Sequence, residues 1–258
     1  MSHDAIHQQV SQRYTEAVTS GGGCCSKSSI TPATSTGEHP EIQSFGCGNP
    51  VAHAGIQAGE TVLDLGSGAG LDLLLASERV GIEGRVIGVD MTDAMLATAR
   101  ANLDLAGATN VELRKGLIER LPVDDGEVDR VLSNCVLNLS PDKSAVFGEL
   151  HRVLKPGGSF TVSDLVADGL PDIVRASSDA WCSCVGGAIS EEAYIAGLRS
   201  AGLVDVVVED RFDYDPETAL ALAKEEKLIQ GIPEAVVAAA LASTVRVASI
   251  RVSGRKPA

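Results

Sequence analysis

The sequence predicts an α/β fold in which a mostly parallel sheet is covered by helices on both faces. From Glu60 onward, short apolar runs rich in Val, Ile and Leu alternate with longer stretches whose apolar residues recur at helical spacing. The length of 258 residues and the hydrophobic content of 44% provide a core for one main domain with additions. Such alternation is typical of a doubly wound sheet, in which a crossover helix follows each parallel strand.

The alternating part of the chain predicts a regular series of strands and helices. The strand runs are short and apolar, and they are expected at residues 61–65, 85–89, 110–114, 128–133 and 158–164. The helical stretches repeat apolar residues every three or four positions, and they are expected at residues 70–80, 92–106 and 142–154. In this order the strands run parallel, so their carboxyl ends share one edge of the sheet.

The regular series is flanked by segments of a different character. Residues 3–18 predict a short helix, and the Gly-, Ser- and Thr-rich segment at 20–39 predicts a mobile stretch. Residues 171–189 predict a helical insertion, and the alternating ASIRVSG near the end of the chain predicts a last edge strand. The remaining elements are a strand and three helices, expected at residues 204–209, 190–201, 216–230 and 233–242.

Composition and charge exclude several classes of partner. The 35 acidic side chains outnumber the 21 basic ones, and the net charge of −14 repels a phosphate backbone, so we expect no nucleic acid partner. The chain has no apolar run long enough for a membrane span, and MSHDAIHQQV lacks the features of a secretory signal. We therefore expect a cytoplasmic protein without a membrane partner. Its six cysteines are spread along the chain, which predicts thiols in a reducing compartment.

A glycine-rich turn follows the first strand of the predicted sheet. In VLDLGSGAGLD, the residues Gly66, Gly68 and Gly70 separate a strand from a helix, so the backbone can approach a ligand closely. Asp90 ends the second strand, where a carboxylate is placed to accept hydrogen bonds from both ribose hydroxyls. A nicotinamide dinucleotide is the rival ligand, but its G-x-G-x-x-G pattern needs a glycine at Leu71. The turn and Asp90 together predict a cofactor that carries a ribose.

Four segments resemble, in order and spacing, the shared motifs of class I S-adenosylmethionine-dependent methyltransferases: DLGSGAG, GVDM, LPVDDGEVDRVLSN and LHRVLKPGG. The resemblance implies a Rossmann-like seven-stranded sheet whose final strand is antiparallel, with S-adenosylmethionine as the cofactor. It implies that the glycine turn contacts the methionine portion, Asp90 the ribose, and the segment from Leu117 to Glu119 the adenine. Many members carry an acid where this chain has Gly116 and Leu117, so Glu119 is the nearest carboxylate to the expected adenine.

The chain is then expected to divide into three regions. Residues 1–50 form a partly mobile, cysteine-bearing segment, and residues 51–170 form the S-adenosylmethionine-binding domain. Residues 171–258 provide an insertion that covers the substrate and a C-terminal region that completes the sheet. The implied cofactor contacts lie in the middle region and are Asp64, Gly66, Gly68, Gly70, Asp90, Met91, Leu117, Ile118 and Glu119.

Three cysteines are candidates for holding the substrate. Cys135 directly follows the strand at 128–133, at the sheet edge where ligands bind, while Cys47 lies in a glycine-flanked turn and Cys184 in the insertion. For each one alone, a small buried apolar residue is the alternative interpretation. However, SFGCGNP, SNCVLNLSPDK and WCSCVGGA resemble the three cysteine-bearing motifs of arsenite methyltransferases, and the resemblance covers nearly the whole chain. It implies Cys135 and Cys184 as the arsenic-binding pair and Cys47 as a third core thiol.

The other three cysteines match the family less directly. Cys24 and Cys25, in GGGCCSKSS, match an N-terminal cysteine position, and one of them is a candidate to resolve a disulfide with Cys47. The alternative is a tail with two inert thiols. Cys182 lies two residues before Cys184 in the sequence CysSerCys, so either of the two can be the arsenic ligand. We favour Cys184.

The expected activity is methyl transfer from S-adenosylmethionine to trivalent arsenic held by thiolates, with arsenite and methylarsenite as substrates. Thiolates suit this thiophilic centre, and its lone pair carries no proton, so no general base is needed. This agrees with five histidines that form no acid/base pattern. The resemblance also implies a redox step in which protein thiols, Cys47 among them, form a disulfide that thioredoxin or glutathione reduces.

Two other functions stay open at this point. One is a methyltransferase for another small apolar molecule, such as a quinone or a sterol. The other is a thiolate module that senses a metalloid without methylating it. A zinc site is disfavoured, because the sequence contains no C-x-x-C pair and no Cys/His cluster.

Overall fold

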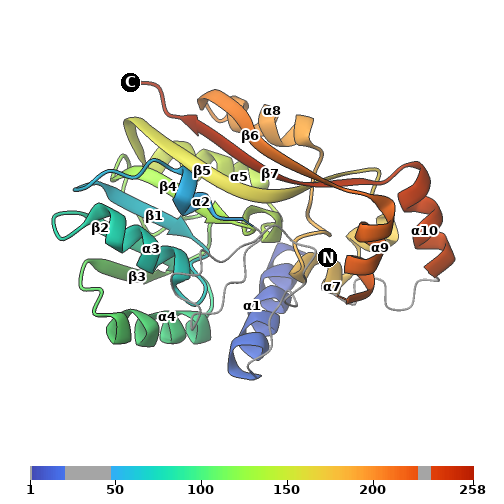
Figure 1. The fold of residues 1–258 in the computed structure, drawn as a ribbon, viewed down its shortest axis with the longest axis horizontal. Helices are drawn as coiled ribbons and strands as arrows, with labels where there is room; N and C mark the ends of the chain where they lie inside the picture. Colours follow the sequence, from blue (N-terminus) through green and yellow to red (C-terminus); the bar gives the residue numbers. More distant parts are fainter. Residues whose placement is uncertain (1, 21–47, 226–233) are drawn as a thin grey trace.

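The structure is a computed structural model that describes residues 2–20, 48–225 and 234–258. Figure 1 shows one twisted sheet with helices packed on its two sides, as the sequence predicts. The predicted mobile segment, apart from Ser20, lies outside the described residues. So do the cysteines Cys24, Cys25 and Cys47.

The sheet contains seven strands in the order β3-β2-β1-β4-β5-β7-β6. Strands β1 to β5 pair in parallel, whereas β7 is antiparallel to both β5 and β6. This confirms the expected Rossmann-like, mostly parallel sheet with an antiparallel final strand. The strands are β1 Thr61–Leu65, β2 Arg85–Asp90, β3 Val111–Lys115, β4 Val128–Asn134, β5 Leu154–Asp168, β6 Val204–Tyr214 and β7 Arg246–Arg255.

The helices of the regular series begin and end close to their predicted positions. The insertion after β5 differs, because it forms two short helices, α6 and α7, joined by irregular backbone. The helices are α1 His3–Ser20, α2 Pro50–His53, α3 Leu71–Val80, α4 Asp93–Ala106, α5 Lys143–Val153, α6 Asp172–Arg175, α7 Ser178–Cys182, α8 Glu191–Ser200, α9 Pro216–Glu225 and α10 Glu234–Ser243, with the 3₁₀ helix η1 at Leu137–Leu139.

The prediction that ASIRVSG forms an edge strand is wrong. This segment lies in β7, which pairs with β5 along one side and with β6 along the other, and β6 forms the edge of the sheet. Residues at the middle of β7, such as Ile250 and Val252, are almost fully buried. An alternating pattern indicates which face of a strand is buried, but it does not indicate whether both edges are hydrogen-bonded.

Two hydrophobic clusters fill the two faces of the sheet. One packs β-strand side chains against α5 and α8, and the other packs them against α2, α3 and α4. Adjacent residues of β1 belong to opposite clusters, with Val62 on the α3 side and Leu63 on the α5 side. This burial on both faces explains why the predicted strands are continuous apolar runs.

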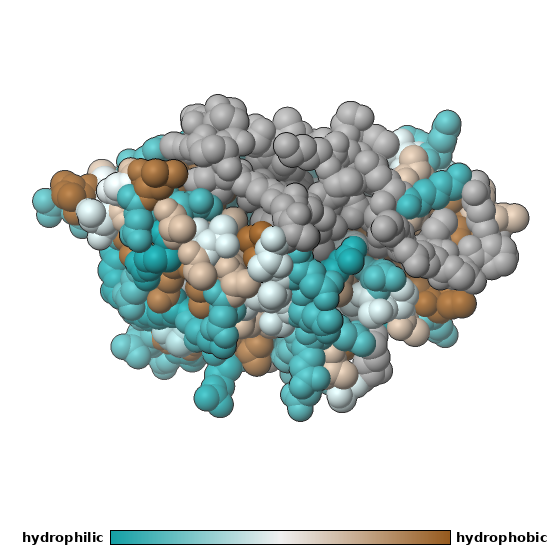
Figure 2. All heavy atoms as spheres, turned by 90° about the horizontal axis from the view of Figure 1, so that it is seen from below, coloured by the Kyte–Doolittle hydropathy of each residue, from teal (hydrophilic) through white to brown (hydrophobic). Residues whose placement is uncertain are grey.

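The carboxyl ends of the central strands lie side by side. Asp64 of β1 is in register with Gly88 of β2 and with Leu132 of β4. Helix α1 lies across this end of the sheet, next to α7 (Figure 1). The described surface seen from below is mostly hydrophilic with scattered apolar residues (Figure 2). Within the described ranges, we find no helix that combines the length and apolarity needed to cross a membrane.

Candidate functional site

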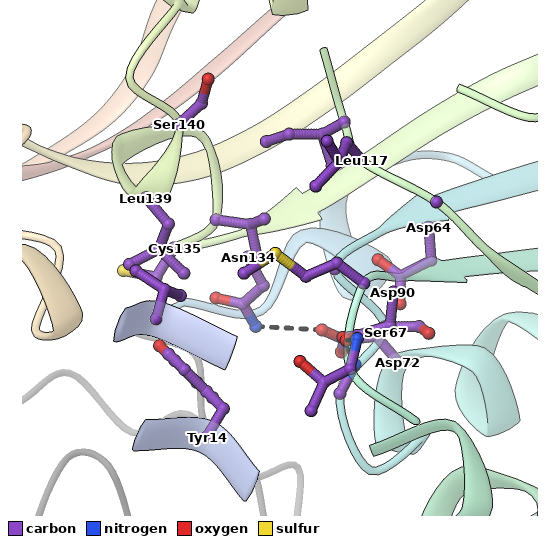
Figure 3. A pocket seen from close by; sticks show the side chains of 18 of the residues that line it. Tyr14, Asp64, Ser67, Asp72, Asp90, Leu117, Asn134, Cys135, Leu139 and Ser140 are labelled. Atoms are coloured by element: carbon purple, nitrogen blue, oxygen red, sulfur yellow. Dashed lines mark hydrogen bonds between the residues drawn. The ribbon is translucent and has the colours of Figure 1, made fainter. Parts of the chain in front are cut away.

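A cavity opens at the carboxyl ends of β1, β2 and β4, the edge of a parallel sheet at which ligands bind. Figure 3 shows its side chains converging from these strand ends and from α1. All nine predicted cofactor contacts except Gly70 line this cavity, and Cys135 does as well. Among the described residues, the lining contains no lysine and no arginine.

The glycine turn at the base of the cavity requires the residues that the sequence places there. Gly66 has a φ of 64°, and a Cβ on it would lie 2.5 Å from a methyl group of Val136. Gly70 has a φ of 92°, and its Cβ would lie 3.2 Å from Ala99 on α4. A side chain at Gly66 would therefore strain the backbone at its positive φ and clash with Val136. Only glycine leaves the turn open to a ligand.

Asp90 is oriented by backbone donors. The amide of Gly68 donates to Oδ2 at 3.0 Å, and the amide of Thr92 donates to Oδ1 at 2.8 Å. Burial raises the pKa of Asp90, while these two N–H groups favour the carboxylate and oppose the rise. The residue thus ties the glycine turn to the end of β2 and presents its carboxylate at the cavity wall.

Two more carboxylates share the cavity with Asp90. Asp64 is 2% exposed, and burial raises its pKa well above the ordinary value, with a further rise from the nearby charges of Asp72 and Asp90. Burial raises the pKa of Asp72 to about 6, although the amide of Asn134 donates to it at 3.0 Å and opposes the rise. Asp72 ends the segment VLDLGSGAGLD and Asn134 precedes Cys135, but neither was predicted as a site residue, because the contact between them joins positions 62 residues apart.

Helix α1 closes one side of the cavity, which sequence analysis did not predict. Its residues His7, Val10 and Tyr14 line the cavity, and His7 Nε2 lies 2.9 Å from Glu119 Oε1. The hydroxyl of Ser140 also donates to this Glu119 oxygen. Glu119, the carboxylate expected nearest the adenine, is therefore engaged by two side chains. The His7–Glu119 contact joins residues 112 positions apart, so no local pattern could reveal it.

Of the two predicted arsenic-binding cysteines, Cys135 lines the cavity, and Cys184 lies against the backbone of Cys135 without being one of the described lining residues. Cys184 Sγ lies 2.7 Å from the backbone carbonyl oxygen of Cys135, and both residues are 3% exposed. Both have positive φ values, 61° for Cys135 and 64° for Cys184, which non-glycine residues rarely adopt. The amide of Cys135 donates to Ser163 at 2.7 Å. Cys135 is disulfide-bonded, whereas Cys184 is a reduced, buried thiol.

Cys182 faces a different environment. It packs in a cluster with Ile6 and Val10 of α1, and the Tyr14 hydroxyl donates to its carbonyl oxygen at 3.4 Å. Its sulfur lies 3.9 Å from the Gln9 carbonyl oxygen. Helix α7 ends at Cys182, and the turn that follows brings Cys184 into contact with Cys135.

The segment that carries Cys184 is packed tightly against η1. A Cβ on Gly187 would lie 2.0 Å from the Asn138 carbonyl oxygen, so glycine is required for this approach. The Lys143 ammonium donates to the Ser140 carbonyl at 3.1 Å and lies 5.6 Å from the centroid of the Trp181 ring. Burial lowers the pKa of Lys143 to about 8, partly offset by Asp164 and Cys184.

Comparison with known proteins supports this site. Residues 56–227 match a methyltransferase domain family. The chain is 41% identical to an arsenite methyltransferase of Halobacterium salinarum, over 80% of this chain and 59% of that protein. It is 38% identical to an arsenite methyltransferase of Aquipseudomonas alcaligenes, over 84% of this chain and 67% of that protein. The chain belongs to the arsenite methyltransferase family.

A solved structure agrees with this family membership. An arsenic(III) S-adenosylmethionine methyltransferase from Chlamydomonas reinhardtii superposes with a TM-score of 0.68 at 32% identity, covering 95% of this chain and 74% of that one. The chain spans about three fifths of the length of the arsenite methyltransferase of Halobacterium salinarum. The fold and the cofactor class are thus those of a class I methyltransferase.

The cavity of this arsenite methyltransferase family member fits S-adenosylmethionine. The buried Ser67 hydroxyl has no hydrogen-bond partner among the described residues, and it lies in the cavity lining. Buried carboxylates without a lysine or an arginine in the described lining suit a ligand that carries positive charge. The sulfonium and the ammonium of S-adenosylmethionine provide that charge.

Proposed function

We propose that this protein transfers methyl groups from S-adenosylmethionine to trivalent arsenic held by the thiolates of Cys135 and Cys184. The observation that carries the proposal is the contact between Cys184 Sγ and the backbone of Cys135, a residue that lines the cavity. Cys184 is favoured over Cys182, because Cys182 packs against α1. The domain boundaries at residues 50 and 170 remain predictions.

The chemistry needs thiolates and alignment more than proton transfer. When bound, S-adenosylmethionine supplies a methyl group on a positively charged sulfur. Cys135 and Cys184 hold arsenic so that its lone pair faces this methyl carbon; as the new As–C bond forms, the electron pair of the broken C–S bond stays on sulfur. Arsenic gives up two electrons formally in this step. The His7–Glu119 pair is not needed as a base, because the lone pair carries no proton.

A redox step then restores trivalent arsenic. Two thiolates supply two electrons and form a disulfide, and we assign Cys47 to this step together with a thiol of the arsenic site. The disulfide bond of Cys135 supports such chemistry at this position. An external dithiol or thiol, such as thioredoxin or glutathione, must reduce the disulfide before Cys135 can bind arsenic again.

Incubation of the protein with labelled S-adenosylmethionine and a thiol reductant tests the proposal. We expect labelled methylarsenicals when arsenite is present and no labelled product in its absence. Parallel reactions should contain a quinone or a sterol in place of arsenite. Labelled quinone or sterol with no methylarsenical would contradict the proposal, and cofactor binding without any transfer would favour a sensor.

A further inference from the structure

The three aspartates of the cavity lining differ in their surroundings. Both oxygens of Asp90 accept backbone N–H groups, which fix the orientation of this carboxylate, the one predicted to bind the ribose. Asp64 is 2% exposed, and its burial favours the neutral carboxylic acid. Asp72 is half-buried and lines the cavity, and the hydrogen bond that the structure gives its side chain is the one from Asn134 to Oδ2. Asp72 thus presents a second oxygen to the cavity.

The position of Asp72 fits one substituent of the cofactor sulfur. That sulfur carries a methyl group, the ribose carbon and the amino acid chain. With the ribose at Asp90 and the methyl group facing Cys135, the amino acid chain must extend along the remaining polar wall. This wall contains Asn134, the residue before Cys135, and its partner Asp72 (Figure 3).

We propose that Asp72, oriented by Asn134, binds the ammonium group of the amino acid portion of S-adenosylmethionine. The inference rests on the proposed function in that it takes S-adenosylmethionine as the cofactor. Both polar atoms of the Asn134 side chain also bond to the Gly48 backbone. Its Oδ1 accepts from the Gly48 amide at 2.9 Å, and its Nδ2 donates to the Gly48 carbonyl at 2.8 Å. The carboxylate is therefore held in place before the ligand binds, which reduces the cost of ordering it. At neutral pH it is largely ionised, since burial raises its pKa only to about 6.

A pair of truncated ligands tests the inference by binding alone. S-adenosylhomocysteine and 5′-methylthioadenosine are both thioethers, and they differ in the amino acid chain. Loss of a charge-assisted hydrogen bond should weaken S-adenosylhomocysteine binding to Asp72→Asn by about 10- to 100-fold. Binding of 5′-methylthioadenosine should change by less than about twofold. Isothermal titration calorimetry measures both dissociation constants.

Three controls define the outcome. Asp104→Asn removes an exposed acid of α4 that does not line the cavity, and it should leave both ligands unaffected. Asp90→Asn should weaken the binding of both ligands, because both carry the ribose. If Asp72→Asn does not fold, Asn134→Ala is used instead, because it keeps the charge of Asp72 but removes the hydrogen bond that orients it. This variant should bind S-adenosylhomocysteine more weakly and 5′-methylthioadenosine with unchanged affinity.

The inference would be overturned if Asp72→Asn weakened the binding of both ligands equally, or if it weakened the binding of neither. If Asp72→Asn is unfolded, equal weakening by Asn134→Ala would overturn it. These experiments contain no arsenic, so their outcome is independent of whether arsenite is the methyl acceptor.

Discussion

At the residue scale, backbone conformation places the two thiols. Cys135 directly follows β4, Cys184 lies two residues after the end of α7, and both adopt the left-handed region of backbone conformation. This conformation costs a non-glycine residue about 1 kcal/mol or more, and such residues cluster at functional sites. The sharp turns bring the Cys184 sulfur to the backbone of Cys135, although the two positions are 49 residues apart.

Serine substitutions should separate the three described cysteines. Cys135→Ser and Cys184→Ser should bind S-adenosylmethionine normally but lose at least about 100-fold of arsenite methylation, because an alcohol does not replace a thiolate ligand. Cys182→Ser is the matched control and should keep most of the activity. Activity assays with calorimetric cofactor binding measure both effects. Full activity of Cys184→Ser with loss in Cys182→Ser would reverse the assignment.

Cofactor binding should depend on pH through Asp72. Burial raises its pKa from 3.8 to about 6, so between these values the folded apo protein binds a proton that the unfolded chain does not. Lowering the pH through this window should therefore stabilise the folded apo protein, through protonation of Asp72. Cofactor affinity should fall below about pH 6, because the protonated Asp72 no longer pairs with the ammonium group. Titration calorimetry from pH 5 to 8 tests this. The fall should be absent in Asp72→Asn, and an unchanged profile there would count against Asp72 as its cause.

At the element scale, the close packing of α7 and the following turn on η1 sets the position of Cys184. Gly187→Ala would bring a methyl group to 2.0 Å from the Asn138 carbonyl, so the turn must shift. We expect a loss of about 10-fold or more in arsenite methylation, since small misplacements of reacting groups reduce rates strongly, with cofactor affinity retained.

Gly148→Ala is the matched control for this substitution. Gly148 lies exposed in α5, with no atom within 4 Å of an added Cβ, and alanine there should stabilise the helix by about 0.5–1 kcal/mol. Its methylation rate should match that of the parent protein. A Gly187→Ala protein that is as active as Gly148→Ala would show that the packing of this turn does not determine the site.

Helix α1 should respond to the cofactor. It lines the cavity and is joined to its wall by the His7–Glu119 contact and by the packing of Val10. Hydrogen exchange of α1 should slow when S-adenosylhomocysteine binds, because opening of this helix then exposes the ligand. Val10→Asp should abolish this protection and weaken binding while leaving the sheet protected. Unchanged exchange in α1 of the parent protein would contradict this role.

Local patterns predict some elements of the site and miss others. The glycine turn and Asp90 were predictable, because a strand, a turn and a helix follow one another within 30 residues and define a backbone geometry. The cover formed by α1 was not, because His7 and Glu119 meet only through tertiary folding. The choice between Cys182 and Cys184 depends on where α7 ends, and helix ends are poorly specified by sequence alone.

At the scale of the whole molecule, the sheet order decides what reaches the cavity. β1 and β4 are adjacent, so Asp64 near the end of β1 and Cys135 directly after β4 lie on neighbouring strands. In contrast, β6 and β7 extend the sheet away from the cavity. The parallel half was predictable from continuous apolar runs. The place of β7 between β5 and β6 was not, because it depends on pairing between distant segments, Ser159 with Arg255 and Val204 with Arg255.

X-ray absorption at the arsenic edge, on the reduced full chain with one equivalent of arsenite, tests the central claim most directly. If Cys135 and Cys184 hold arsenic, Cys184→Ser should lose one sulfur neighbour of arsenic or lose the bound arsenic altogether. Cys182→Ser should give the same spectrum as the parent protein. The same number of sulfur neighbours in the parent protein and in Cys184→Ser would contradict the assignment of this cysteine as an arsenic ligand.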